Sequence, residues 1–186
     1  MPNWCDNKLV VKGPKAELER FVKTAAGVPH KETAEEVISA DSFIPYPKKF
    51  LDMDKQAHAA EEDYSRKYKE AGMEKSENAT NCEILVYGKT WEAWHKANPR
   101  PDVKDGYNSG GYEWCIQHWG TKWGFCDTAR YIRPRSVVYT FNTAWSPPVP
   151  LIEKMSDMFP KLTFILNFEC EGEGLGKERI EYKAQA

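Results

Sequence analysis

Apolar and polar positions along the chain repeat with two different periods, and these periods divide the sequence into strands and helices. Alternation at every second position predicts strands at residues 8–12, 125–132, 137–144 and 162–170, with an edge strand near 177–183. Spacing of three and four residues predicts helices at residues 14–26, 51–73, 90–97, 112–119 and 147–159. The pattern therefore indicates a protein that mixes helices with an antiparallel sheet.

Prolines and glycines mark the ends of several of these elements. Pro14 opens the first helix, where its missing N–H costs nothing, and Gly27 with Pro29 ends it. Gly120 stands where the end of a helix favours left-handed backbone. Residues 98–111 are rich in Pro, Asp and Gly and are predicted to form a loop.

Six of the predicted elements follow the order βαββαβ. This order predicts an α+β fold of the ferredoxin-like, split-βαβ kind, an antiparallel sheet with two helices on one face. It requires residues 28–124 to be one long, mostly helical insertion between the first helix and the second strand. We therefore expect a single ferredoxin-like domain over residues 1–186. The pattern leaves open whether the insertion covers the second face of the sheet.

The composition narrows the class of protein. A hydrophobic content of 41% and a charged content of 29% fit a soluble globular protein. The formal net charge of -2 excludes a globally basic nucleic-acid binder. No apolar run reaches the roughly 18 residues of a membrane span, and the polar first residues do not resemble a signal peptide. The five cysteines show no framework spacing, so we expect free thiols and a cytoplasmic protein.

Residues 112–124 hold three of the seven tryptophans, which predicts either a core layer or a recognition surface. Helical spacing places four side chains on an inward face: Tyr112, Cys115, Ile116 and Trp119. Trp114 and His118, four residues apart, then share a different face.

We interpret this second face as a candidate binding surface for a flat or anionic ligand, held by stacking and charge. The predicted ligand- or partner-binding residues are Trp114, His118, Lys122, Trp123 and Arg130. Arg130 belongs to a basic patch with Arg133, Arg135 and the nearby Lys122. The alternative is that Trp114 and Trp123 only attach the insertion to the sheet.

The sequence also offers candidates for catalysis and metal binding. The acid–base candidates are His118, Asp127, Glu169 and Glu171, and Glu173 continues the acidic alternation. Cys115, His118, Cys126 and Asp127 have the character of soft metal ligands, but no second paired motif accompanies them. We therefore expect no metal site and no cofactor. For the carboxylates, the alternative is a solvated strand end.

Three segments carry a resemblance to a known family. Met-Pro-Asn-Trp-Cys at 1–5 with Asn7, Trp-Gly-Thr-Lys-Trp at 119–123, and Phe-Asn-Thr-Ala-Trp-Ser-Pro-Pro at 141–148 before Phe159-Pro160 resemble the YubB-type ferredoxin-like domain family. Its members are small phage- and plasmid-encoded proteins of unknown function. The resemblance implies a ferredoxin-like fold and an origin in a mobile element, and it supplies no catalytic residues. Residues 48–105 carry no matching motif.

Three functions follow as hypotheses. The first is a non-catalytic binding module that captures a host protein or a small nucleotide-like ligand, for example to counter a host defence system. The second is a small acid–base hydrolase or transferase that uses His118 with the acidic residues. The third, nucleic-acid binding through the sheet, is not favoured, because Tyr139 and Phe141 are predicted to face the core.

Overall fold

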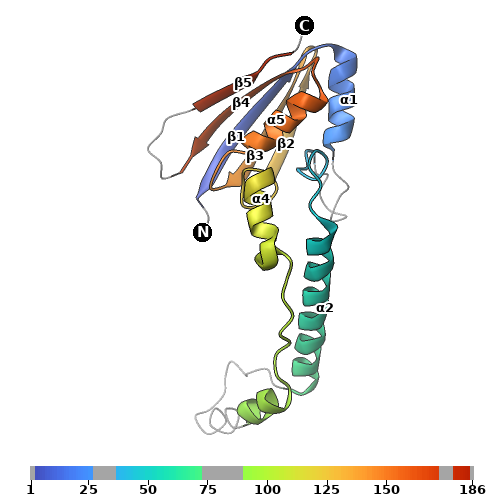
Figure 1. The fold of residues 1–186 in the computed structure, drawn as a ribbon, viewed down its shortest axis with the longest axis vertical. Coiled ribbons are helices and arrows are strands. Elements are labelled where there is room, and N and C mark those ends of the chain that lie inside the picture. The colour runs from blue at the N-terminus through green and yellow to red at the C-terminus, as the bar shows by residue number, and fades with distance from the viewer. Residues whose placement is uncertain (1–2, 27–36, 73–89, 172–177, 185–186) are drawn as a thin grey trace. The chain divides into compact units, whose positions relative to one another are not determined.

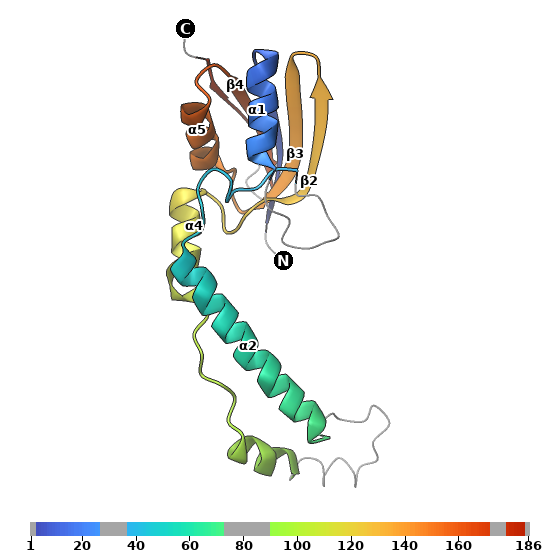
Figure 2. The ribbon, with the colours of Figure 1, turned by 90° about the vertical axis from the view of Figure 1, so that its right-hand side faces the viewer.

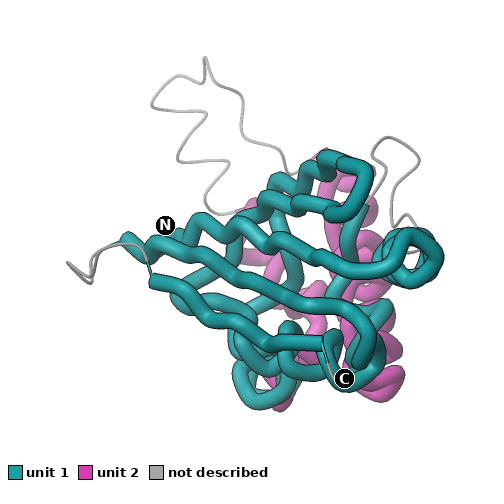
Figure 3. Tube along the Cα trace, turned by 90° about the horizontal axis from the view of Figure 1, so that it is seen from above, with its two compact units in different colours: residues 1–46, 111–186 teal, residues 47–110 magenta. Residues whose placement is uncertain are grey.

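The computed structural model describes residues 3–26, 37–72, 90–171 and 178–184. The chain divides into two compact units, residues 1–46 with 111–186 as the first unit and residues 47–110 as the second (Figure 3). The predicted insertion at 28–124 is thus divided between them. Only its central part forms the second unit, whereas its described flanks, 37–46 and 111–124, belong to the unit that contains the sheet.

The first unit is built on a five-stranded antiparallel sheet (Figure 1). Its strands are β1 (Trp4–Lys12), β2 (Cys126–Arg133), β3 (Ser136–Ala144), β4 (Thr163–Cys170) and β5 (Glu178–Tyr182). The strand order is β2-β3-β1-β4-β5, so the four strands of the split-βαβ plan adjoin one another and β5 extends one edge. The predicted ferredoxin-like fold class is confirmed.

Strand β1 is longer than the sequence pattern predicts. It begins at Trp4 rather than at residue 8, and Cys5 pairs with Thr143 of β3 on one side and Cys170 of β4 on the other. Asn7 interrupts the apolar alternation but is buried, because its Nδ2 donates to the Cys5 carbonyl oxygen at 2.8 Å and to Thr143 Oγ1 at 2.9 Å. Polar partners inside the fold therefore extend the strand beyond its apolar positions.

Helices α1 (Lys15–Ala25) and α5 (Val149–Met158) cover the same face of the sheet (Figure 2). Between helices and sheet lies an apolar core in which Phe21 of α1 makes edge contacts with Tyr139 of β3 and Phe164 of β4. Tyr139 and Phe141 are fully buried on this face, as their alternation predicts. Burying each large apolar side chain stabilises the fold by about 1.5–3 kcal/mol.

Helix α4 (Tyr112–His118) follows a turn at Tyr107–Gly111, in which Ser109 and Gly110 have non-helical backbone angles, so the predicted loop at 98–111 leads directly into the helix. Gly120 closes the helix with a φ of 75°, which confirms the predicted left-handed position. A Cβ atom at Gly120 would also lie 2.5 Å from Cδ of Pro150. Both the backbone angle and the space available require glycine here.

The predicted inward face of α4 is partly wrong. Cys115 and Trp119 are buried, but Ile116 is 36% exposed and Tyr112 is only half-buried. The helix is anchored instead on the side of Trp119, whose Nε1 donates to the Ile44 carbonyl oxygen at 2.8 Å. The side of α4 that carries Cys115 and Trp119 is therefore the buried one.

The second unit contains α2 (Lys48–Glu70) and a short helix at residues 90–97. Helix α2 buries only Phe50 of its own residues, and pairs such as Arg66 with Glu70 cover its surface. Tyr64 Oη lies 2.6 Å from Nδ1 of His95, whose short helix also supplies Trp94, 5.5 Å from the Tyr64 ring. In the part of the chain that is described, no helix combines the length and apolar character of a membrane span.

The expectation of free thiols is wrong for two of the five cysteines. Cys5 and Cys170 are directly opposed in the β1–β4 pairing and form a disulfide. Cys115 and Cys126 are free, and Cys82 lies outside the described residues. Sequence spacing could not reveal this bond, because the strand register creates the proximity of the two cysteines.

Candidate functional site

Trp114 and His118 lie against each other on α4, as their spacing predicts. Their ring centroids are 4.4 Å apart and the planes are inclined by only 12°, so the rings are stacked. His118 Nδ1 lies 2.9 Å from the Trp114 carbonyl oxygen. Because a carbonyl only accepts hydrogen bonds, Nδ1 carries the proton and donates it.

Of these two residues, Trp114 has a structural role. Its indole makes edge contacts with the rings of Tyr46 at 5.5 Å and Trp119 at 5.3 Å, next to the apolar core. His118 stacks on Trp114 and is exposed. The indole therefore helps to anchor α4, and the imidazole is the group presented to solvent.

A second aromatic group surrounds Lys122. The Lys122 ammonium nitrogen lies 4.5 Å from the ring centre of Trp145, 5.2 Å from that of Trp123 and 5.9 Å from that of Tyr112. Trp4 joins the group through an edge contact with Trp123 at 6.2 Å. We call these five residues the Lys122 cluster. Distances within about 6 Å permit cation–π attraction.

Trp145 is the most exposed tryptophan of the Lys122 cluster and has an unusual backbone. Its side chain is 46% exposed, and its φ is 75°, in the left-handed region. This conformation costs roughly 1–2 kcal/mol for a residue with a Cβ atom. The Trp145 N–H donates to the Asn3 carbonyl oxygen at 2.8 Å, which holds the strained turn after β3. Trp145 could not be predicted as a site residue from the sequence, because a positive φ leaves no signal in the residue pattern.

Hydrogen bonds between polar groups stabilise the turn that follows β3. Thr143 Oγ1 donates to the Ser146 carbonyl oxygen at 2.8 Å, and Ser146 Oγ donates to the Gly120 carbonyl oxygen at 2.6 Å. Thr121 is fully buried, with its Oγ1 3.2 Å from the Ala144 carbonyl oxygen. The three sequence motifs, from the start of the chain, residues 119–123 and residues 141–148, therefore meet around the Lys122 cluster.

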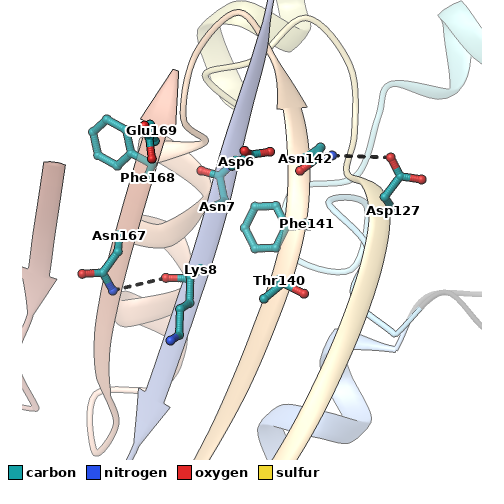
Figure 4. A pocket seen from close by; sticks show the side chains of 10 residues that line it. All are labelled: Asp6, Asn7, Lys8, Asp127, Thr140, Phe141, Asn142, Asn167, Phe168 and Glu169. Carbon is teal, nitrogen blue, oxygen red and sulfur yellow. Dashed lines mark hydrogen bonds between the residues drawn. The ribbon is translucent and has the colours of Figure 1, made fainter. Parts of the chain in front are cut away.

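The face of the sheet opposite the helices contains a hollow of about 440 Å³ (Figure 4). Its polar lining comes from four strands: Asp6, Asn7, Lys8, Asp127, Thr140, Asn142, Asn167 and Glu169. Asp127 sits at an irregularity of β2 with a φ of 50°. Asn142 Nδ2 donates to Asp127 Oδ2 at 3.5 Å (Figure 4). We call this the sheet-face hollow.

The predicted acid–base residues are not all brought together. Asp127 and Glu169 line the sheet-face hollow, and His118 is not among its lining residues. The Glu171 carboxylate accepts a hydrogen bond from the Trp4 N–H at 3.1 Å, beside the β1–β4 pairing. With three carboxylates and one ammonium, the hollow is negative and repels phosphate groups.

The candidate metal ligands have little thiolate character. Cys115 is buried, and desolvation together with the negative charge of Asp41 raises its pKa to about 11. Burial also raises the pKa of Cys126. Among the described residues, no three His, Cys, Asp or Glu side chains gather in a way suited to a metal ion. The thiolate that soft metals require is therefore disfavoured at both positions.

The predicted basic patch does not include Lys122. Arg133 and Arg135 are exposed at the turn that leads into β3. Lys122 lies at the other end of that strand, where its backbone N–H donates to the carbonyl oxygen of Ala144. The nine residues of β3 span roughly 27 Å at the rise of an extended strand. Arg130 lies between these ends on β2, opposite Tyr139.

Comparison with known proteins supports the fold of the C-terminal part. A family model described as a ferredoxin-like domain in Api92-like protein matches residues 118–185, which include β2 to β5. The chain is thus similar in this region to a ferredoxin-like domain of Api92-like proteins. The match covers less than half of the chain and does not include β1 or α1, which complete the sheet and its helical face.

One solved structure also resembles the chain. It is the crystal structure of the protein api92 from Yersinia pseudotuberculosis, with 11% sequence identity, complete coverage of both chains and a TM-score of 0.41. A likeness at this level supports no argument about function. Comparison with curated proteins finds no match.

Proposed function

We propose that the chain is a non-catalytic binding module that captures a protein partner through the Lys122 cluster. The observation that supports this function is Trp145, a large aromatic residue held at a positive φ with nearly half of its side chain in solvent. Backbone strain of this kind occurs preferentially at functional sites, where the surrounding structure maintains it. Tryptophan and tyrosine are also the residues enriched at the energetic centres of protein interfaces.

The arrangement of Lys122 favours a protein over a nucleotide-like ligand. Its ammonium already faces three aromatic rings, so a phosphate group would compete with those rings for the cation. A protein surface that presents apolar side chains to Trp145 contacts the cluster without drawing the ammonium away from its rings. The resemblance to mobile-element proteins supports a host protein as the partner, including a component of a defence system.

The enzyme and nucleic-acid hypotheses receive less support. The predicted base His118 stacks on Trp114, while Asp127 and Glu169 line the sheet-face hollow. The aromatic residues of β3 that a nucleic-acid-binding sheet would use, Tyr139 and Phe141, lie in the core. No observation favours either alternative over a binding surface at Trp145.

A photo-crosslinking experiment tests the proposal. A photoreactive amino acid is placed at residue 145, and in a matched control at residue 131, where exposed Tyr131 lies on β2. We expect a specific bacterial protein to crosslink only at residue 145. The purified partner should then bind the Trp145→Ala variant about thirtyfold more weakly or worse, and bind Tyr131→Ala normally.

Two results would contradict the proposal. One is a partner whose affinity is unchanged in Trp145→Ala. The other is a retained small molecule, seen by native mass spectrometry of the purified protein, whose loss accompanies Trp145→Ala. The second result would assign the Lys122 cluster to a small ligand instead of a protein.

A further inference from the structure

A second surface of the first unit has the form of a peptide groove. It has a volume of about 480 Å³ and lies between α1 and the hairpin that joins β2 to β3. Its lining residues on α1 are Lys15, Leu18, Glu19, Val22 and Lys23, and on the hairpin they are Ile132, Arg133, Pro134 and Val137. None of these residues belongs to the Lys122 cluster or to the sheet-face hollow.

The fold explains why this groove exists. Helix α1 packs through Phe21 onto Tyr139 of β3, one strand inside the edge of the sheet. The edge strand β2 therefore extends beyond the helix, and Ile132 on its helix-facing side is 66% exposed. Leu18 and Val137 are buried at the base of the groove, so the surface between helix and edge strand is apolar.

The backbone of β2 offers a second binding feature. Because β2 stands at one end of the sheet order, alternate N–H and C=O groups along it point away from β3. The pairing of β2 with β3 is regular from Ala129 to Arg133, beside the groove. An extended peptide can therefore add to this edge as a further strand.

The charged side chains around the groove indicate which kind of peptide it would bind. Lys15, Lys23 and Arg133 line the groove, and the only acidic side chain among the lining residues, Glu19, is 3.8 Å from the Lys15 ammonium. Arg130 and Arg135 lie on the same strand and its turn. The apolar groove is thus bordered by positive charge, which favours carboxylates in the bound segment.

We propose that this groove binds an extended, acidic peptide segment of a partner protein by strand addition to β2. Every second side chain of such a strand points to the helix side, where apolar residues would contact Ile132 and Val22. Acidic residues at the ends of the segment would meet Lys23 and Arg133. A second copy of this chain fits less well, because pairing two β2 edges would bring their arginines together.

The probe is a fluorescein-labelled peptide of eight residues in which valine alternates with threonine, with glutamates at both ends. One control peptide replaces the valines by serine, and another replaces the glutamates by lysine. Binding to the full chain is measured by fluorescence anisotropy at low and high salt. We expect saturable binding of the first peptide, weaker binding at high salt, and no saturation with either control peptide.

Variants of exposed residues locate the binding site without disturbing the core. Ile132→Asp and Lys23→Glu should each weaken binding by about tenfold or more. Tyr131→Asp is the matched control for the first, because Tyr131 is 58% exposed on the opposite face of the same strand. Lys154→Glu, at an exposed position of α5, is the control for the second. Both controls should bind like the unmodified chain.

The proposal is overturned if the valine peptide does not bind at concentrations up to about 1 mM. Equal binding of the serine peptide, or loss of binding in Tyr131→Asp but not in Ile132→Asp, would also overturn it. Concentration-dependent dimers that Ile132→Asp dissolves would assign the groove to a second copy instead. All of these outcomes are independent of Trp145 and so of the proposed function.

Discussion

The ammonium nitrogen of Lys122 lies 4.5 Å from the centre of the Trp145 ring. The two residues come from different loops, one after α4 and the other after β3, and each loop contains a residue with left-handed backbone, Gly120 in the first and Trp145 in the second. Glycine accepts that conformation freely, whereas tryptophan does so at a cost. This difference leads to the first prediction.

Trp145→Gly should be more stable than Trp145→Ala by about 1 kcal/mol, because glycine relieves the strain at φ 75° and alanine retains it. Both variants lose the same indole contacts, so the comparison isolates the backbone. Urea unfolding followed by circular dichroism measures the difference. Equal stability, or a more stable alanine variant, would show that the turn is not strained.

Gly120→Ala should destabilise the first unit by at least about 2 kcal/mol, because it combines left-handed backbone with overlap against Pro150. Gly124→Ala is the matched control, since its added Cβ meets nothing nearer than Cβ of Ala40 at 4.0 Å. Thermal unfolding of both variants provides the comparison. A similar loss in the two variants would contradict the role assigned to Gly120.

Tyr139 should make stability depend on pH in the alkaline range. Burial raises its pKa to about 12, against the opposing charge of Arg130, so the folded state favours the protonated hydroxyl. The resulting contribution of Tyr139 to the free energy of unfolding is fully present below pH 10, the approximate pKa of tyrosine in the unfolded chain. It is lost as the pH rises towards 12. The expected loss is on the order of 2–3 kcal/mol.

Tyr139→Phe should remove this alkaline loss, while Tyr131→Phe, an exposed control, should retain it. At neutral pH the first variant should be nearly as stable as the original chain, because the guanidinium of Arg130 is near the buried Tyr139 hydroxyl but does not form a well-aligned hydrogen bond with it. Denaturant unfolding between pH 8 and pH 11 tests both statements. An alkaline loss that persists in Tyr139→Phe would assign it to other groups.

The disulfide between Cys5 and Cys170 should stabilise the sheet. Replacing both cysteines by alanine is expected to lower the free energy of unfolding by about 2–5 kcal/mol. Alkylation without reductant, followed by mass spectrometry, should leave these two cysteines unmodified and label Cys126. Cys126→Ala is the control for loss of a half-buried thiol, and labelling of Cys5 in the native protein would exclude the bond.

The fold class could be predicted because it depends on local periodicity. The alternation in β3 and β4 and the helical spacing in α1 and α5 are each contained in one short, continuous segment of the sequence. The start of β1 was missed because Asp6 and Asn7 break the alternation, and only burial against Thr143 explains Asn7. Ile116 was misplaced because a helix of seven residues takes its orientation from the Trp119 anchor and not from its own pattern.

Only part of the candidate site could be predicted from the sequence. Trp114 and His118 lie one helical turn apart, so their stacking follows from helix geometry alone. The Lys122 cluster joins residues from the first strand, α4 and the turn after β3, and no local pattern contains that proximity. Trp145 belongs to one of the three segments that carry the family resemblance, at residues 141–148. Its exposure and its backbone angle, however, are properties of the folded turn.

The bond between Cys5 and Cys170 closes the chain into a covalent ring with a sequence separation of 165 residues. Along the chain, the whole second unit, residues 47–110, lies within this ring. A single protease cut in that unit would therefore leave two fragments still joined, separable only after reduction. Strands β1 and β4 would stay held together after such a cut, so the second unit can be cleaved while the sheet remains one covalent body.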